Sequence, residues 1–319
     1  MDWNTRKRIV FFAHFDLGNI IDDYVIYYLQ EIRKYADYLV FVSTSPLPPA
    51  EVEKGKLFCD KLMIRENIGY DFFSWHVGME NVPDIDQYDE LVICNDSAYG
   101  PLFPLREMFE KMSGAGCDFW GITDSHSFNY HLQSYFIVFG RMVFTSREFK
   151  SFFKNLIVGH CKDEIIIKCE VALTQTLLRS NFKAGVYMPS LNSLFRLICA
   201  RGIQIKNRGI KRVVRDFKEK KPFTRSRWDV KQINKSHMFW EELVKRHRMP
   251  FLKAELIREN PGTINISNYQ DVLKNYTRYD ASLITRHSER IKRTLPASLL
   301  SIIFLQCIYP FVHYLADVS

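Results

Sequence analysis

Short apolar segments alternate with segments of helical periodicity over the first two-thirds of this 319-residue chain. Strands that alternate with helices favour an α/β fold, in which a largely parallel sheet is covered by helices on both faces. We expect strands at Arg8–His14, Tyr38–Val42, Lys61–Arg65, Glu90–Cys94, Asp118–Ile122, Ser134–Phe139 and Lys183–Val186. We expect helices at Ile20–Arg33, Pro49–Cys59, Pro104–Lys111, Phe149–Ile157 and Ile165–Arg179, with a further helix starting near Phe72.

Composition and the absence of certain motifs indicate which molecules the protein can bind and in which compartment it works. The net charge of +8 favours acidic partners such as nucleotide diphosphates or anionic lipid. The chain has no zinc-ligand spacing, no RNP-like aromatic motif and no recognition-helix signature, so we expect no nucleic-acid partner. Seven cysteines without a C-x-x-C motif indicate free thiols in a reducing compartment. The first residues form no apolar signal region, so we expect a cytoplasmic protein.

The apolar run Leu91–Cys94 ends abruptly in Asn95-Asp96-Ser97. This pattern predicts a buried strand that delivers one carboxylate and two small polar groups to its carboxyl end, where open α/β sheets bind ligands. A carboxylate there can hold Mg²⁺ or Mn²⁺ against a diphosphate. The same triplet is ordinary turn and helix-capping chemistry, so the sequence leaves both interpretations open.

Five polar residues and one glycine also lie at or after the ends of other expected strands, and they would meet at the same edge of the sheet. They are His14, Asp16, Asn67, Gly69, Asp71 and Asp124. Glu170 is expected in the first turn of a helix, where the helix dipole favours a carboxylate. Helix capping and turn formation are the structural alternatives for these residues.

Glycosyl transfer from a nucleotide sugar would use this pattern. The leaving diphosphate must be neutralised by a metal or by basic groups, and an inverting transfer needs one general base. Asp96 suits the first role; Glu170, or Asp124 in its place, suits the second. The chain lacks a G-x-G-x-x-G turn, a Walker A motif and a G-x-S-x-G elbow, which excludes the commonest dehydrogenases, NTPases and hydrolases.

Several ordered motifs resemble the rhamnan synthesis protein F family of bacterial polysaccharide glycosyltransferases. They are Asn67–Trp75, Asn95–Pro101, Asp118–Gly121, His131–Phe136 and Pro250–Lys253, within a similarity that covers roughly residues 8–262. The resemblance implies a role in building rhamnan, O-antigen or a related cell-surface glycan. It implies dTDP-L-rhamnose as donor, a lipid-linked glycan as acceptor and, from the linkages of rhamnans, inversion.

The order of elements also resembles the GT-A glycosyltransferase fold. That resemblance implies nucleotide-sugar binding by His14, Asp16, Asn67, Gly69 and Asp71. It places Asn95, Asp96 and Ser97 on the D-x-D positions, with Asp96 as the metal ligand, and Glu170 on the base position. Because Asp96 is the one acidic member of the triplet, the use of Mg²⁺ or Mn²⁺ stays open.

We expect three parts: a catalytic α/β domain at residues 1–200, a basic and mainly helical extension at 201–294, and an apolar tail at 295–319. The basic run Arg201–Arg227 is either a solvated face or a phosphate- or lipid-facing patch. The apolar segment Leu295–Ala316 favours an interfacial anchor over a packed helix. These features predict a peripheral protein on the inner face of the plasma membrane. A non-catalytic, membrane-associated polysaccharide assembly protein is the alternative.

Overall fold

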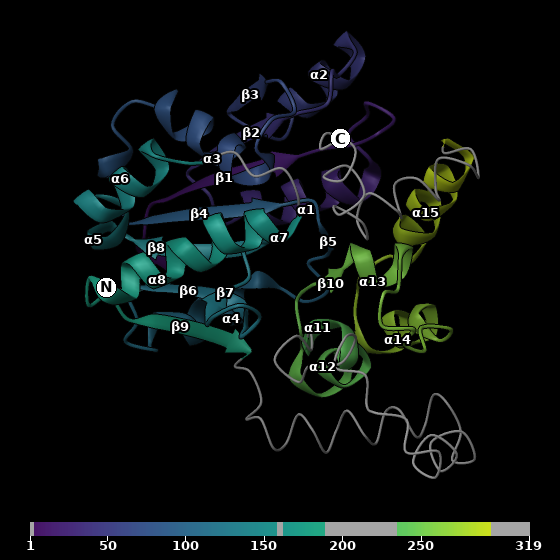
Figure 1. The fold of residues 1–319 in the computed structure, drawn as a ribbon. Coiled ribbons are helices and arrows are strands. Elements are labelled where there is room, and N and C mark those ends of the chain that lie inside the picture. Colours follow the sequence, from purple (N-terminus) through teal and green to yellow (C-terminus); the bar gives the residue numbers. More distant parts are fainter. Residues whose placement is uncertain (1–2, 158–161, 189–234, 295–319) are drawn as a thin grey trace, which may run out of the picture.

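A mixed β-sheet lies at the centre of the protein (Figure 1). The structure, a computed structural model, describes residues 3–157, 162–188 and 235–294. Within these ranges the sheet has eight strands in the order β3-β2-β1-β4-β8-β6-β7, and β9 pairs with β6. The strands are β1 (Arg8–His14), β2 (Tyr38–Ser43), β3 (Lys61–Ile64), β4 (Glu90–Asn95), β6 (Phe119–Ser125), β7 (His131–Leu132), β8 (Phe136–Gly140) and β9 (Ala184–Met188).

Most of the sheet is parallel. Strands β3, β2, β1 and β4 run in one direction, and β6 and β9 run parallel to each other. Strand β8 is antiparallel to both β4 and β6, so β4 and β6 point the same way. The carboxyl ends of β1, β4 and β6 therefore share one edge of the sheet, together with the residues that precede β8. The expected α/β class, a mostly parallel sheet flanked by helices, is confirmed.

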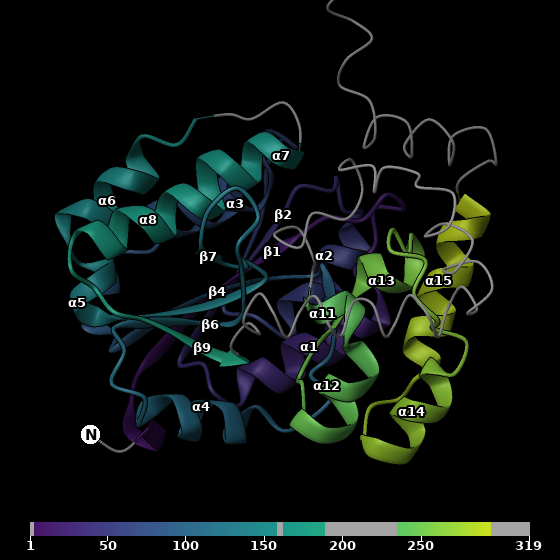
Figure 2. The ribbon, with the colours of Figure 1, turned by 60° about the horizontal axis from the view of Figure 1, so that its bottom comes forward.

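Helices cover both faces of the sheet because its buried strands alternate side chains between two apolar clusters (Figure 2). Val10 and Phe12 of β1 belong to one cluster, and Ile9 and Phe11 belong to the other. The first cluster packs against α1 (Asp23–Arg33), α2 (Pro49–Lys56), α4 (Leu105–Ser113) and α12 (Trp240–His247). The second packs against α3 (Tyr70–Glu80), α5 (Arg141–Phe144), α6 (Arg147–Lys154), α7 (Lys162–Ile165), a π-helical segment (Ile166–Val171) and α8 (Ala172–Arg179).

The C-terminal elements share the first cluster. Strand β10 (Leu252–Lys253) pairs antiparallel with β5 (Ala98–Tyr99), directly after the Asn-Asp-Ser triplet. The Phe251 ring packs against Tyr28 and Phe136, with centroid distances of 5.0 and 5.7 Å. The remaining helices of this part are α11 (Lys235–Met238), α13 (Ala254–Arg258), α14 (Tyr269–Tyr276) and α15 (Ser282–Thr294). Short 3₁₀ turns lie at Trp3–Thr5 and Ile85–Gln87.

The predicted elements lie within a few residues of the observed ones, with one correction that concerns the site. Glu170 is not in the first turn of a helix, because α7, the π-helical segment and α8 form one continuous helix with Glu170 inside it. The helix expected near Phe72 begins at Tyr70, so Asp71 lies in its first turn. The two-residue strands β5, β7 and β10 were not predicted.

Two predictions about the C-terminal half lie outside the described residues: the basic run Arg201–Arg227 and the apolar segment Leu295–Ala316. None of the helices that the structure describes has the length and apolar character that a membrane crossing requires. The cysteines in the described ranges (Cys59, Cys94, Cys117 and Cys169) are free thiols, as expected. The division of the chain into three parts stays a prediction.

Candidate functional site

Asp96 is held against the end of the first strand. The backbone N–H of Phe15 donates to Asp96 Oδ2 at 2.9 Å, and Tyr24 donates its hydroxyl to the Asp96 carbonyl at 3.1 Å. Burial, with the negative charge of Asp71 nearby, raises the pKa of Asp96 to about 8. The buried His14 ring interacts with Ser43 Oγ through Nδ1, at 2.9 Å. Its Nε2 lies 4.0 Å from Asp96 Oδ2 and has no hydrogen-bond partner among the described residues.

Asn95 connects the triplet to the helix that follows β3. Its side-chain nitrogen donates to Asp71 Oδ2 at 2.7 Å, and its oxygen accepts from the backbone N–H and hydroxyl of Ser97 at 3.1 and 2.7 Å. Burial raises the pKa of Asp71, although the bond from Asn95 opposes the rise. Asn95 and Ser97 thus form a turn, as the structural interpretation predicts. The same Asn95 also links the end of β4 to Asp71, whose charge acts on Asp96.

The loop between β3 and α3 is held by Arg65. Its guanidinium donates to the carbonyls of Glu66, Ile68 and Tyr70 at 2.8, 2.7 and 2.6 Å. Gly69 has φ +76°, and a Cβ at this position would lie 2.2 Å from the Phe73 ring. Gly69 therefore serves the backbone of this loop. Asn67 is exposed in the same loop.

Asp16 is engaged by the C-terminal helix α15. Arg290 donates to Asp16 Oδ1 at 3.1 Å, contacts Asp16 Oδ2, and donates through Nε to Asp22 Oδ2 at 2.9 Å. Gly18 donates its N–H to Asp16 Oδ1 at 2.7 Å, and a Cβ on Gly18 would lie 2.8 Å from the guanidinium. Asp16 therefore lies at the predicted edge but fastens the loop after β1 to α15.

Glu170 lies in the π-helical segment, and such segments are frequent at functional sites. Ser134 donates its hydroxyl to Glu170 Oε1 at 2.5 Å, and His131 Nε2 lies 3.4 Å from Oε2. Burial alone would raise the pKa of Glu170, but His131 and Ser134 together lower it. His131 Nδ1 donates to the Asn129 carbonyl at 2.9 Å, so both ring nitrogens face acceptors. Burial opposes the charged form of His131, yet Glu170 raises its pKa overall.

The second candidate base, Asp124, lies beside the same histidine. It pairs with Leu132 across the β6–β7 hairpin and is 7% exposed. Its Oδ1 has no hydrogen-bond partner among the described residues, and its charge contributes to the raised pKa of His131. The structure thus brings both candidate bases to one hairpin.

Two cations at this edge were not predicted as site residues. The Lys253 ammonium lies 3.8 Å from the centroid of the Tyr135 ring, and its charge opposes the rise in the pKa of Asp71. Arg258 acts in the same way on Asp96. Lys253 belongs to the segment Pro250–Lys253 that carries part of the family resemblance, which was the available signal for it. Arg290 had no local signal, because its partners lie in loops at the other end of the chain.

The donor set for a metal is small. The described residues contain no group of three or more histidine, cysteine, aspartate or glutamate side chains arranged to hold a metal ion. Asp96 supplies one carboxylate, which is compatible with Mg²⁺ where phosphate oxygens and water provide the other ligands. The amide of Asn95 is engaged at both ends, since its nitrogen donates to Asp71 and its oxygen accepts from Ser97.

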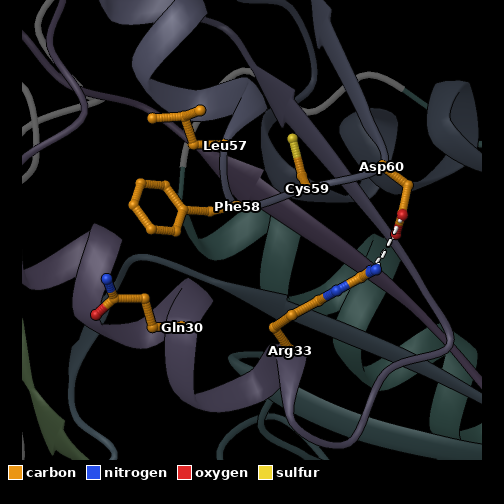
Figure 3. Close-up of a pocket in the computed structure, with 6 residues that line it drawn as sticks. All are labelled: Gln30, Arg33, Leu57, Phe58, Cys59 and Asp60. Atoms are coloured by element: carbon orange, nitrogen blue, oxygen red, sulfur yellow. Dashed lines mark hydrogen bonds and ion pairs between the residues drawn. The ribbon is translucent and has the colours of Figure 1, made fainter.

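An open pocket of about 430 Å³ lies at the opposite edge of the sheet (Figure 3). It is lined by Gln30, Arg33, Leu57, Phe58, Cys59 and Asp60. Asp60 forms an ion pair with Arg33 and accepts from the Leu39 N–H at 2.7 Å, close to the start of β2. The pocket is therefore separate from the polar cluster at the carboxyl ends of β1 and β4.

Comparisons with known proteins identify relatives in polysaccharide synthesis and virulence. A family model described as rhamnan synthesis protein F matches residues 39–194. The virulence protein VirA of Vibrio anguillarum is 27% identical over 268 residues, which cover 81% of this chain and 82% of VirA.

Two solved structures are also similar. A putative nucleotide-diphospho-sugar transferase from Desulfovibrio desulfuricans has a TM-score of 0.35 and 14% identity, covering 58% of this chain and 80% of that one. The glycosyltransferase GlyE of Streptococcus pneumoniae has a TM-score of 0.40 and 12% identity, covering 92% and 66%. The family match confirms the resemblance of this chain to the rhamnan synthesis protein F family, over residues 39–194.

Proposed function

We propose that this protein is a glycosyltransferase that moves a sugar from a nucleotide-sugar donor to a cell-surface glycan. The observation that carries the proposal is the junction of Asp71, Asn95 and Asp96, which holds two partly buried carboxylates where β1 and β4 end. Ligands of α/β sheets bind at such an edge. The family match covers this part of the chain.

The donor side of the site is formed by the ends of the parallel strands. The residues proposed to bind the nucleotide sugar are His14, Asp16, Asn67, Gly69, Asp71, Asn95 and Ser97. Asp96 orients the diphosphate, with or without Mg²⁺ or Mn²⁺. The family supports dTDP-L-rhamnose as donor and a lipid-linked glycan at the inner face of the plasma membrane as acceptor.

Glu170 is the proposed general base, and Asp124 is the alternative. The acceptor hydroxyl loses its proton to Glu170 while its oxygen attacks the anomeric carbon from the face opposite the diphosphate. The bond between that carbon and the diphosphate oxygen breaks, the nucleoside diphosphate leaves, and the anomeric configuration inverts. A positioned general base contributes about 10²–10⁴-fold to such a step. Ser134 and His131 keep the Glu170 carboxylate ionised and oriented.

Transfer assays on the full chain test this proposal. Donors are dTDP-L-rhamnose and a panel of other nucleotide sugars, with lipid-linked glycan as acceptor. We expect Glu170→Gln and Asp96→Ala to lose about hundredfold or more in transfer rate while remaining folded. The matched control is Glu80→Gln, an exposed carboxylate that also lies near a histidine.

Nucleotide binding separates the proposal from its alternative. A folded wild-type protein whose melting temperature responds to no nucleotide or nucleotide sugar contradicts the transferase and favours a non-catalytic assembly role. Full activity in Glu170→Gln together with loss in Asp124→Asn would move the base to Asp124.

A further inference from the structure

A diphosphate bound at the end of β4 would meet carboxylates. The charge of Glu170 acts on Asp71, and the charge of Asp71 acts on Asp96. Each negative charge near a phosphate costs binding free energy unless a cation compensates it. The described residues supply no group of three metal-ligating side chains for that purpose. Lysine and arginine side chains of the chain itself could therefore compensate the negative charges of the carboxylates and the diphosphate.

Lys253 is fixed next to the triplet by backbone pairing. In the β5–β10 ribbon Lys253 lies opposite Ala98, and the N–H of Ala254 donates to the Ser97 carbonyl at 2.9 Å. The Lys253 ammonium rests 3.8 Å from the centroid of the buried Tyr135 ring, a cation–π contact that orients it. From there its charge reaches both Asp71 and Glu170.

Arg258 is the last residue of α13, the helix that follows Lys253 directly. This helix begins at Ala254, whose N–H donates to the Ser97 carbonyl. The charge of Arg258 acts on Asp96 and on Tyr24, whose hydroxyl donates to the Asp96 carbonyl. The contact of Arg258 with Glu259 is 3.8 Å long, and the Arg258 side chain is 36% exposed. Binding a phosphate would therefore not require Arg258 to leave a short, buried ion pair with Glu259.

Two carboxylates at this edge, Asp16 and Glu170, have a charged partner within the chain. Arg290 holds Asp16, and His131 holds Glu170. Asp71 accepts a hydrogen bond from Asn95, and Asp96 accepts one from the Phe15 N–H. Neither of these donors carries a charge, whereas Lys253 acts on Asp71, and Arg258 on Asp96, as a cation.

We infer that Lys253 and Arg258 bind the diphosphate of the nucleotide donor and stabilise its charge as it leaves, so that a nucleoside diphosphate binds without a divalent metal. This inference rests on the proposed function and names the groups that would neutralise the leaving group. Arg and Lys clamps on phosphoryl groups are an established way of stabilising such charge. The guanidinium adds bidentate hydrogen bonding to phosphate oxygens.

Binding of dTDP, UDP, GDP and inorganic pyrophosphate to the full chain tests the inference, by calorimetry in EDTA and again with Mg²⁺ or Mn²⁺. We expect binding in EDTA by wild type. Lys253→Gln and Arg258→Gln should each weaken it about tenfold or more, and Lys253→Arg should retain most of it.

The chain offers matched controls on α12 and just after it. Lys245 lies over the Tyr276 ring at 5.2 Å, and Arg248 pairs with Glu107. Lys245→Gln and Arg248→Gln remove the same charges outside the site, so they should leave affinity unchanged. Thermal unfolding verifies that each variant is folded. If Lys253→Gln does not fold, Arg258→Gln, whose side chain is partly exposed, carries the test.

Two results would overturn the inference, and only the second would also contradict the proposed function. In the first, no nucleotide binds in EDTA, and with Mg²⁺ or Mn²⁺ the affinity is the same for wild type, Lys253→Gln and Arg258→Gln. That result would contradict the inference but remain compatible with a metal-dependent transferase. Failure of folded wild type to bind any of these ligands, with or without metal, would remove the proposed function as well.

Discussion

At the scale of single residues, His131 shows how geometry determines a protonation state. Its Nδ1 donates to a carbonyl and its Nε2 faces Glu170, so only the imidazolium satisfies both contacts. The pKa of His131 is raised above 6.5 and that of Glu170 is lowered below 4.5. The ion pair is therefore fully present between these two pKa values. Its contribution to stability is lost as the pH rises through the folded-state pKa of His131 or falls through that of Glu170.

We predict that removing one partner moves the pKa of the other in the direction that burial dictates. In Glu170→Gln the pKa of His131 should fall below 6.5, because burial then dominates. In His131→Asn the pKa of Glu170 should rise, so the acidic limb of the transfer rate moves to higher pH. NMR titration of labelled histidines measures the first shift, and a pH–rate profile measures the second. His76, paired with Glu80 on the surface, is the control. An unchanged His131 titration in Glu170→Gln would contradict the pairing.

Asp16 shows a different case. It was predicted to bind the nucleotide sugar, and in the structure its carboxylate is engaged by Arg290 of α15. Asp16 and Asp22 have side chains only 8% and 9% exposed, and Arg290 compensates both. We predict that Arg290→Met costs about 3 kcal/mol in free energy of unfolding, because it leaves two buried carboxylates without their cation. Urea unfolding measures this loss.

The neighbouring surface pair gives the comparison for Arg290. Arg286 pairs with Asp23 at 3.5 Å, and both side chains are more than half exposed. Arg286→Met should therefore cost less than about 1 kcal/mol. Equal losses in the two variants would show that the Asp16–Arg290–Asp22 cluster is no stronger than a surface pair.

At the scale of elements, the start of α3 depends on one glycine. Gly69 has φ +76° and its Cβ position is filled by the Phe73 ring. We predict that Gly69→Ala destabilises the protein by about 2 kcal/mol. Gly114→Ala is the control, since Gly114 has φ −91° and the nearest atom lies 4.0 Å from its Cβ position. Chemical unfolding of both variants measures the difference, and equal stabilities would show that this loop relaxes freely.

The elements that could be predicted are those with a local pattern. The buried strand Arg8–His14 has a continuous apolar run, and it was predicted with its observed bounds. Strands β5, β7 and β10 have two residues each and no pattern of their own, since pairing with distant segments forms them. The π-helical segment around Glu170 likewise keeps a helical sequence pattern, so its position within the helix was not predictable.

The candidate site likewise contains residues with a local sequence pattern and residues that only tertiary structure brings there. The polar groups at strand ends were recognised because each follows an apolar run, and His14, Asp71 and Asp96 do lie together. The groups that compensate their charge were missed. Lys253 lies in a motif that the resemblance includes, but its place beside the triplet depends on the pairing of β10 with β5. Arg258 and Arg290 reach the site through packing of α13 and α15, which no local pattern indicates.

At the scale of the whole molecule, the sheet and the C-terminal helices share one apolar cluster. Phe251 is 1% exposed and touches Tyr28, Tyr135 and Phe136. We predict that Phe251→Ala lowers the free energy of unfolding by about 3 kcal/mol or more, within a single unfolding transition. Denaturant unfolding followed by tryptophan fluorescence and by circular dichroism provides the measurement. Two separate transitions would contradict a shared core.

The contact between Arg290 and Asp16 also has a consequence for synthesis of the protein. Asp16 is translated well before α15, the helix that fastens it. During synthesis the loop after β1 therefore lacks its cation until α15 has been translated. A chain that ends before α15 would contain every proposed nucleotide-binding residue but not the Arg290 that binds Asp16 and Asp22. Premature termination within α15, before Arg290, should therefore leave Asp16 and Asp22 without their cation although the whole sheet has been translated.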